Sequence, residues 1–110
     1  MAYKVVITPP AKHQLEMYVA YTISEFKNVQ AARAIRDDAA ETKKRLSHIA
    51  ASLALCEDEL LAKSGYRRIM FEKHDFFMVY RIDGNTVIVD AMYHELQDYE
   101  AVFAQKMHLN

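Results

Sequence analysis

Charged side chains recur through the last half of the chain at spacings that could bring them to one surface. Arg68, Arg81 and His94 each stand within an apolar segment, and Asp90 lies in the same segment as His94. If these segments are adjacent strands, alternate residues along each strand point to the same face of the sheet. Guanidinium and imidazole groups on one face supply the positive charge and the hydrogen-bond donors that an anionic ligand requires. We therefore expect Arg68, Arg81 and His94 to line one surface, with a structural ion pair at Arg81 and a solvated or capping His94 as the alternative.

Composition and one turn indicate the strands that would position these residues. Arg67–Phe71, Phe76–Ile82 and Thr86–His94 are rich in Phe, Ile, Val, Met and Tyr, the residue types that favour strands. Asp83-Gly84, between the last two segments, is the pattern of a two-residue hairpin turn. We expect three antiparallel strands joined by this turn and by a four-residue turn over Glu72–Asp75.

The expected turns set the pairing of the strands and therefore the composition of each face. An Asp83-Gly84 turn places Tyr80 opposite Val87 and Met78 opposite Val89. One face is then nearly all apolar and comprises Arg67, Ile69, Phe71, Phe76, Met78, Tyr80, Ile82, Val87, Val89, Ala91 and Tyr93. The other face adds the charged groups to an apolar floor and comprises Arg68, Met70, Phe77, Val79, Arg81, Ile88, Asp90, Met92 and His94.

The first half of the chain predicts one strand followed by two helices. Tyr3–Thr8 is short and β-branched, and Thr8 can cap a helix of roughly 18 residues that begins with proline. Asn28 can cap the second helix, and so short a connection favours an antiparallel helical hairpin. The second helix carries one apolar stripe at helical spacing. Its members are Ile35, Ala39, Thr42, Leu46, Ile49 and Leu53.

These elements predict a single α+β domain over residues 1–110. A last helix begins after Asp98, so the order is β-α-α-β-β-β-α, with the helical hairpin packed on a small, mainly antiparallel sheet. The chain has 52% hydrophobic residues but no apolar run of membrane-spanning length, which predicts a cytoplasmic protein without a membrane. The single cysteine, Cys56, reads as an apolar filler at the end of a helix, and the five histidines show no metal-ligand spacing with it. We expect no metal and no cofactor.

Net charge is −1, so binding of a nucleic acid must depend on a local patch rather than on the whole surface. Four cations fall within the segment from residue 67 to residue 81, namely Arg67, Arg68, Lys73 and Arg81. An acidic stretch containing Glu57 and Glu59 precedes them.

Three short motifs in this order resemble the C-terminal sheet of the RelE/ParE toxin superfamily. They are G-Y-R-R-I-M-F at 65–71, M-V-Y-R-I at 78–82 and V-D-A-M-Y-H at 89–94, followed by L-Q-D-Y-E at 96–100. The N-terminal strand and helical hairpin agree in order and length, so the resemblance covers the whole chain. It implies the toxin of a type II toxin–antitoxin module, bound and neutralised by a cognate antitoxin. Within the superfamily, some members cut mRNA on the ribosome and ParE-like members poison DNA gyrase.

In the nuclease members a ribose 2′-OH attacks the adjacent phosphate, which requires a base, an acid and a cation. The resemblance implies that Arg68 stabilises the phosphorane and that His94 is the general acid. Glu59, or else Glu57, is the possible base. The resemblance extends the substrate-binding surface to Arg67, Lys73, Arg81 and Tyr93.

Two departures from the nuclease pattern favour a gyrase-directed or weakened toxin. Glu95 stands where the closest nuclease members have a tyrosine after the histidine, and the chain is slightly acidic rather than strongly basic. The matches at Arg68 and His94 favour a ribosome-dependent mRNA endonuclease, which is the function that we expect. A gyrase inhibitor without nuclease activity, and a non-toxic co-repressor that acts with the antitoxin, are the alternatives.

Overall fold

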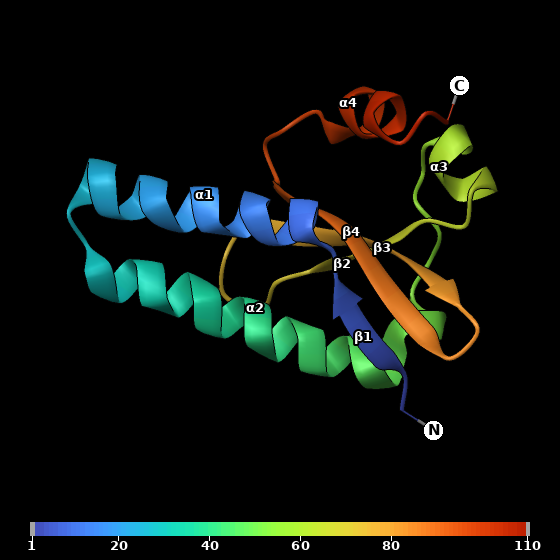
Figure 1. Cartoon of the computed structure of the whole chain (residues 1–110), viewed down its shortest axis with the longest axis horizontal. Coiled ribbons are helices and arrows are strands. Elements are labelled where there is room, and N and C mark those ends of the chain that lie inside the picture. The colour runs from blue at the N-terminus through green and yellow to red at the C-terminus, as the bar shows by residue number, and fades with distance from the viewer. Residues whose placement is uncertain (1, 110) are drawn as a thin grey trace.

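The structure, a computed structural model described for residues 2–109, contains one four-stranded sheet and a long helical hairpin (Figure 1). The elements are β1 (Lys4–Ile7), α1 (Pro9–Phe26), α2 (Val29–Ile49), the 3-10 turn η1 (Ala50–Ser52), α3 (Glu59–Lys63), β2 (Arg67–Met70), β3 (Phe76–Asp83), β4 (Thr86–His94) and α4 (Tyr99–Lys106). The sheet order is β1-β4-β3-β2. β1 runs parallel to β4, and the other pairs are antiparallel. The predicted α+β class and the hairpin of helices on the sheet are confirmed.

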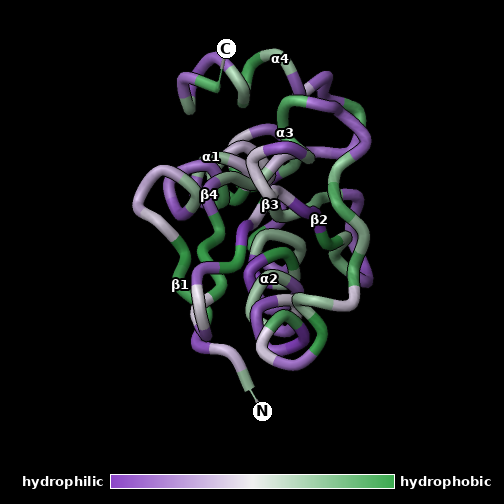
Figure 2. The backbone as a smooth tube through the Cα atoms, turned by 90° about the vertical axis from the view of Figure 1, so that its right-hand side faces the viewer, coloured by the Kyte–Doolittle hydropathy of each residue, from purple (hydrophilic) through white to green (hydrophobic). Residues whose placement is uncertain are grey.

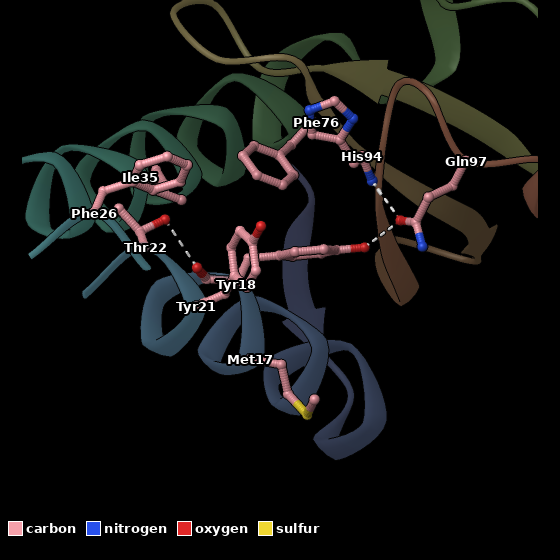
Figure 3. A pocket seen from close by; sticks show the side chains of 9 residues that line it. All are labelled: Met17, Tyr18, Tyr21, Thr22, Phe26, Ile35, Phe76, His94 and Gln97. Carbon is pink, nitrogen blue, oxygen red and sulfur yellow. Dashed lines mark hydrogen bonds between the residues drawn. The ribbon is translucent and has the colours of Figure 1, made fainter. Parts of the chain in front are cut away.

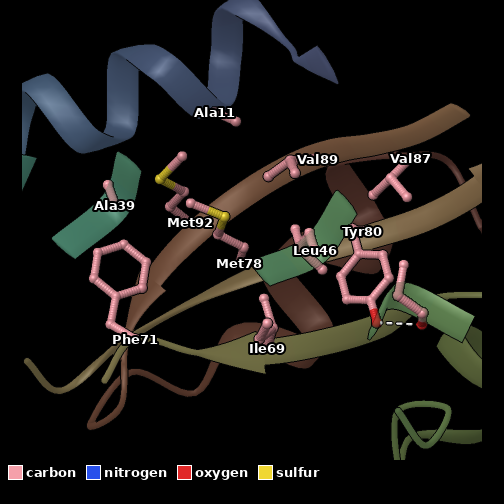
Figure 4. Close-up of a cluster of buried hydrophobic side chains, with 11 residues drawn as sticks. Ala11, Ala39, Leu46, Ile69, Phe71, Met78, Tyr80, Val87, Val89 and Met92 are labelled. Atoms are coloured by element: carbon pink, nitrogen blue, oxygen red, sulfur yellow. Dashed lines mark hydrogen bonds between the residues drawn. The ribbon is translucent and has the colours of Figure 1, made fainter. Parts of the chain in front are cut away.

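The sheet lies between two helical layers. Figure 2 shows α2 below the sheet and α4 above it. The hairpin covers one face of the sheet, where buried residues of both long helices pack against the strands (Figure 4). α3 and α4 cover the other face with a second buried cluster that contains Leu61 and Phe103. Both faces of this small sheet are therefore closed to water over much of their area.

Both long helices begin at the predicted caps. The Thr8 hydroxyl accepts a hydrogen bond from the N–H of Ala11 at 3.4 Å, and the Asn28 side chain accepts one from Ala31 at 2.9 Å. Each cap satisfies an N–H group that has no partner inside its helix. Lys27, in the left-handed region with φ 52°, ends α1 and leaves only two residues between the helices.

The apolar stripe of α2 faces the sheet as predicted. Ile35, Ala39 and Leu46 are buried and Ile49 is half-buried. Thr42 is also fully buried, and its hydroxyl donates to the carbonyl oxygen of Asp38 at 2.7 Å. The helix ends earlier than the stripe, because η1 takes over before Leu53 is reached.

The predicted pairing of β3 with β4 is wrong at two places. The turn occupies Gly84 and Asn85 rather than Asp83 and Gly84, since Asp83 pairs with Thr86 and Tyr80 pairs with Val89. That shift of two residues leaves the faces unchanged. Beyond it, however, Val79 pairs with Ala91, so Asp90 is an extra residue with no partner on β3. Asp90 is a β-bulge, and a bulge of one residue reverses the faces of everything that follows it in the strand.

The bulge exchanges the faces of the last four residues of β4. Ala91 and Tyr93 lie in the cluster beneath α4, although we expected them under the helical hairpin. Met92 lies in the cluster under the hairpin, on the face opposite to the prediction. His94 pairs with Phe76, which also packs against the hairpin cluster.

The segment between η1 and β2 contains a helix that we did not predict. Asp58 caps α3 by accepting a hydrogen bond from the N–H of Leu61 at 3.1 Å, and Leu61 is fully buried. Cys56 is buried as expected, but it lies before this helix rather than at the end of α2. Asp98 precedes α4 as predicted, yet its side chain makes no capping hydrogen bond.

Leu46→Ala should destabilise the protein strongly, because Leu46 has no exposed surface and its removal leaves a cavity in the core. We expect a loss of about 2–5 kcal/mol in the free energy of unfolding, measured by urea denaturation. Leu96→Ala is the matched control, since Leu96 is 89% exposed. Its expected cost is within about 0.5 kcal/mol, and equal losses for the two variants would contradict this description of the core.

Candidate functional site

The predicted site residues do not form one site. Arg68 and Arg81 lie on the face of the sheet that α4 covers, since their strand neighbours Phe77 and Val79 belong to the cluster beneath α4. His94 lies on the other side, with its ring edge against Phe76 at 5.1 Å between centroids. The expectation that Arg68, Arg81 and His94 line one surface is therefore wrong, and the bulge at Asp90 is the reason.

Arg81 belongs to a structural network around the bulge. The Asp90 carboxylate, whose side chain is 7% exposed, accepts hydrogen bonds from Arg81 Nε at 2.9 Å and from the Tyr66 hydroxyl at 2.8 Å. The hydrogen bond to Asp90 raises the pKa of Arg81. Burial, followed by the hydrogen bond to Asp90, raises the pKa of Tyr66 to about 12, so this hydroxyl stays a neutral donor. The ion-pair alternative for Arg81 is confirmed, with Asp90 itself as the partner.

Arg68 is exposed and lies over aromatic rings. Its guanidinium carbon is 4.8 Å from the centroid of Phe77 and 5.8 Å from that of Tyr99. Within residues 2–109 Arg68 makes no salt bridge, so its donors remain free toward solvent. It could hold an anion, but His94 lies on the opposite face of the sheet.

The other predicted contacts are dispersed. Arg67 is half-buried and donates to the carbonyl oxygen of Leu53, which is a packing role. Tyr93 is 5% exposed, with its hydroxyl buried. Lys73 lies in the loop between β2 and β3, and Glu59 starts α3. Of these residues, only Lys73 and Glu59 are exposed, and they lie on separate elements.

A groove opens along the helical hairpin where it extends past the sheet. The hairpin extends past the sheet (Figure 1), and every residue from 20 to 30 is exposed or half-buried because no strand lies against it. The resulting groove has a volume of about 630 Å³. It is lined by Met17, Tyr18, Tyr21, Thr22, Phe26, Ile35, Phe76, His94 and Gln97 (Figure 3).

The walls of this hairpin groove are mostly aromatic and aliphatic. Met17 and Tyr21 are each 57% exposed, and Phe26 is 67% exposed. Tyr18 and Phe76 form its base, with their ring centroids 4.7 Å apart. Several large apolar side chains exposed together on a small protein mark a surface that binds another molecule.

Hydrogen bonds fix the polar end of the groove. Gln97 Oε1 accepts from the backbone N–H of His94 at 2.9 Å and also from the Tyr18 hydroxyl (Figure 3). His94 Nδ1 accepts from the N–H of Leu96 at 3.1 Å. Burial raises the pKa of Tyr18, so its hydroxyl remains the donor in this arrangement. The loop after β4 is thereby tied to α1.

A buried carboxylate on α2 holds the loop that leads to Phe76. Asp38 is 4% exposed and accepts hydrogen bonds from the backbone N–H of Glu72 at 3.2 Å and of Lys73 at 2.9 Å. Its Oδ2 also lies 2.7 Å from His74 Nδ1. Burial acts to raise the pKa of Asp38, but the bonds from His74 and from the two N–H groups outweigh it, and the pKa is lowered. The carboxylate is therefore ionised at neutral pH.

Sequence reasoning missed both Asp38 and the groove. Asp38 stands inside the apolar stripe of α2, three residues after Ile35, and an acidic residue at a core position was the available signal. For the groove, the signal was the apolar character of several faces of α1, where Met17, Tyr21 and Phe26 cannot all face the sheet.

Comparison with known families supports the sequence resemblance. Residues 5–99 match the sequence model of a family described as the ParE toxin of the type II toxin–antitoxin system parDE. None of the curated proteins compared with the chain matches it. Among the described residues, no helix is both long and apolar enough to span a membrane.

Two solved structures share the fold. A chain of the chromosomal ParDE toxin–antitoxin system from P. aeruginosa is 19% identical, with a TM-score of 0.69 over 84% of this chain and 96% of that chain. A chain of the toxin–antitoxin complex RelBE2 from Mycobacterium tuberculosis is also 19% identical, with a TM-score of 0.58 over 86% of this chain and 99% of that chain.

Asp38→Asn should destabilise the protein by about 1–3 kcal/mol at pH 7, because a buried, charged acceptor is lost. The lowered pKa means that Asp38 stabilises the fold above the pKa of the unfolded chain, and that this contribution disappears as the pH falls through the folded value. We therefore expect the stability difference between wild type and variant to shrink below about pH 4. Asp37→Asn, on the exposed side of the same helix, is the control for urea denaturation at both pH values. A difference that grows on acidification would contradict the assignment.

Proposed function

This chain belongs to the ParE toxin family of type II toxin–antitoxin systems, and from that membership we propose that it poisons DNA gyrase without cutting RNA. The observation that carries the proposal is the position of Arg68 and His94 on opposite sides of the sheet. Gyrase is the target that the resemblance to ParE-like toxins implies. The nuclease that we first expected from sequence requires an acid, a base and a cation at one phosphate, and the separation of Arg68 from His94 favours gyrase over it.

RNA cleavage by 2′-OH attack requires the acid, the base and the cation around a single phosphate. Here the sheet and its core separate the imidazole of His94 from the guanidinium of Arg68. Glu59 starts α3, on the side of Arg68, and is therefore separated from His94 as well. The fold thus keeps the exposed Arg68 guanidinium apart from His94, the proton donor that the reaction would use.

The surface charge also favours a protein target. Arg81 is neutralised by Asp90, and Arg67 is bonded to a carbonyl oxygen, so two of the four clustered cations are not free for phosphates. The chain as a whole carries −1. Binding to ribosomal RNA depends on many cation–phosphate contacts, and this cluster leaves Arg68 and Lys73 for them.

The hairpin groove is the proposed docking site for a cognate antitoxin. Its apolar walls are open along α1, and a helix laid in such a groove buries them by the usual helix-in-groove mode. Both solved structures that share the fold come from toxin–antitoxin systems, which supports the same kind of partner here. An antitoxin helix in the groove would cover the part of the hairpin that extends past the sheet and that no strand covers.

Pulse labelling of cells after induction of the chain tests the target. Gyrase poisoning should stop incorporation of thymidine before that of methionine, and the purified protein should cause gyrase-dependent DNA breaks without cutting ribosome-bound mRNA. Early arrest of protein synthesis, together with mRNA cleavage in the ribosomal A site, would contradict the proposal and restore the nuclease.

Tyr21→Asp should weaken capture of the co-expressed antitoxin, because it places a charge in the middle of the apolar groove. Loss of an interface anchor worth about 2 kcal/mol corresponds to roughly a thirtyfold rise in Kd. Ser24→Asp is the control, since Ser24 is exposed on the same helix but does not line the groove. Equal affinity of the two variants, measured by titration calorimetry, would remove the groove from the antitoxin interface.

A further inference from the structure

The free polar groups at the inner end of the hairpin groove are hydrogen-bond donors. Gln97 Oε1 already accepts two bonds, so its amide nitrogen is the part that remains available. His94 Nδ1 accepts a hydrogen bond from the N–H of Leu96, so the ring carries its proton on Nε2. No described residue accepts a hydrogen bond from this Nε2–H. The Tyr18 hydroxyl already donates its hydrogen bond to Gln97 Oε1. The end of the groove therefore has two unused donors, on His94 and Gln97, which point in different directions (Figure 3).

No carboxylate lines the groove to meet these donors. Its nine lining residues include no Asp or Glu, and the nearby acids Glu95 and Asp98 in the following loop are not among them. A partner that covers this end with apolar atoms alone would bury both donors without acceptors, which costs about 1–3 kcal/mol for each group. The chemistry of the groove therefore calls for an acceptor next to an apolar anchor.

We propose that the polar end of the groove recognises a carboxylate of the antitoxin, and that His94 is the residue that selects it. This inference rests on the antitoxin docking proposed above and adds the chemistry of the docked segment. The segment is an amphipathic helix with a large apolar side chain over Tyr21 and Phe26 and an Asp or Glu that reaches His94 Nε2. In this role His94 is a specificity determinant and takes no part in bond cleavage.

The shape of the groove limits the spacing in that segment. Tyr18, Tyr21, Thr22 and Phe26 follow one face of α1 over eight residues, which is about 12 Å along the helix axis. His94 and Gln97 lie at the Tyr18 end (Figure 3). A helix laid along α1 thus carries its acid one or two turns from its anchor, at a spacing of about four to eight residues.

Two substitutions at position 94 separate the hydrogen bond from the packing of the ring. His94→Phe keeps a ring against Phe76 but removes the donor, and it should raise the Kd for the purified cognate antitoxin about 10- to 100-fold. His94→Gln retains an N–H near the Nε2 position and should stay within about threefold of wild type. Circular dichroism and thermal unfolding confirm that both variants are folded.

A double-mutant cycle identifies the acid on the antitoxin. Each Asp or Glu of the antitoxin segment is changed to Asn or Gln and measured against wild type and His94→Phe. One substitution should weaken binding to the wild-type chain about tenfold and have little further effect on His94→Phe, since the two changes remove the same contact. Additive effects at every acidic position would overturn the inference.

A fragment tests the same chemistry without the antitoxin. The ¹⁵N-labelled chain is titrated with 3-phenylpropionate and, separately, with 3-phenylpropionamide. The carboxylate should shift the signals of His94, Leu96 and Gln97 and bind about tenfold more tightly than the amide, and His94→Phe should abolish that preference. Equal binding of the two fragments to wild type would overturn the assignment of the donors to a carboxylate.

The outcomes distinguish failure of this inference from failure of the proposed function. If Tyr21→Asp weakens antitoxin binding while His94→Phe does not, the groove docks the antitoxin but His94 does not select its acid. If neither substitution affects binding, the antitoxin docks elsewhere, and the proposed docking site fails together with the inference.

Discussion

The carboxylate of Asp90 organises both faces of the sheet. Asp90 is an extra residue in β4, and its carboxylate is held in place by hydrogen bonds from Arg81 and Tyr66. A carboxylate that is nearly removed from water requires such partners, because an unpaired buried charge is strongly destabilising. With the bulge in place, Met92 turns toward the helical hairpin, and Ala91 and Tyr93 turn toward α4. Each cluster thereby gains side chains that a regular strand would have sent to the opposite face.

The location of the binding surface follows from the same bulge. If β4 were a regular strand, His94 would lie on the same face of the sheet as Arg68, as we expected from the alternation of side chains alone. Instead it joins Phe76 and Tyr18 at the end of the hairpin groove. Arg68 and His94, the two residues that match the nuclease pattern, therefore lie on different faces of the sheet. The groove gains His94 as part of its polar end. Asp38 completes this arrangement from the other side, because it holds the loop that precedes Phe76.

The parts of the fold that could be predicted from sequence are those that depend on neighbours in the chain. Thr8 and Asn28 cap helices through bonds to residues three positions away, and the stripe of α2 repeats with the period of one helix. The bulge depends on contacts among Tyr66, Arg81 and Asp90, which lie on three different segments. The alternation of side chains along a single strand does not indicate such contacts. The groove was harder still to predict from sequence, since it exists because the sheet ends before the hairpin does. In the sequence its residues resemble ordinary core positions, and only the structure shows that no strand covers them.

The parallel pairing of β1 with β4 also sets the order in which this protein can be built. Val5 pairs with Val87, so this strand must wait for a partner that is synthesised about 80 residues later. Until then, the helical hairpin leaves the ribosome with the apolar stripe of α2 uncovered, since the strands that bury it come later in the chain. Contacts so distant in sequence form slowly, and exposed apolar surface on a nascent chain invites association with other molecules. A truncated translation product that lacks the sheet would therefore be an aggregation-prone pair of helices. Its groove would also have no His94 or Gln97 at its end.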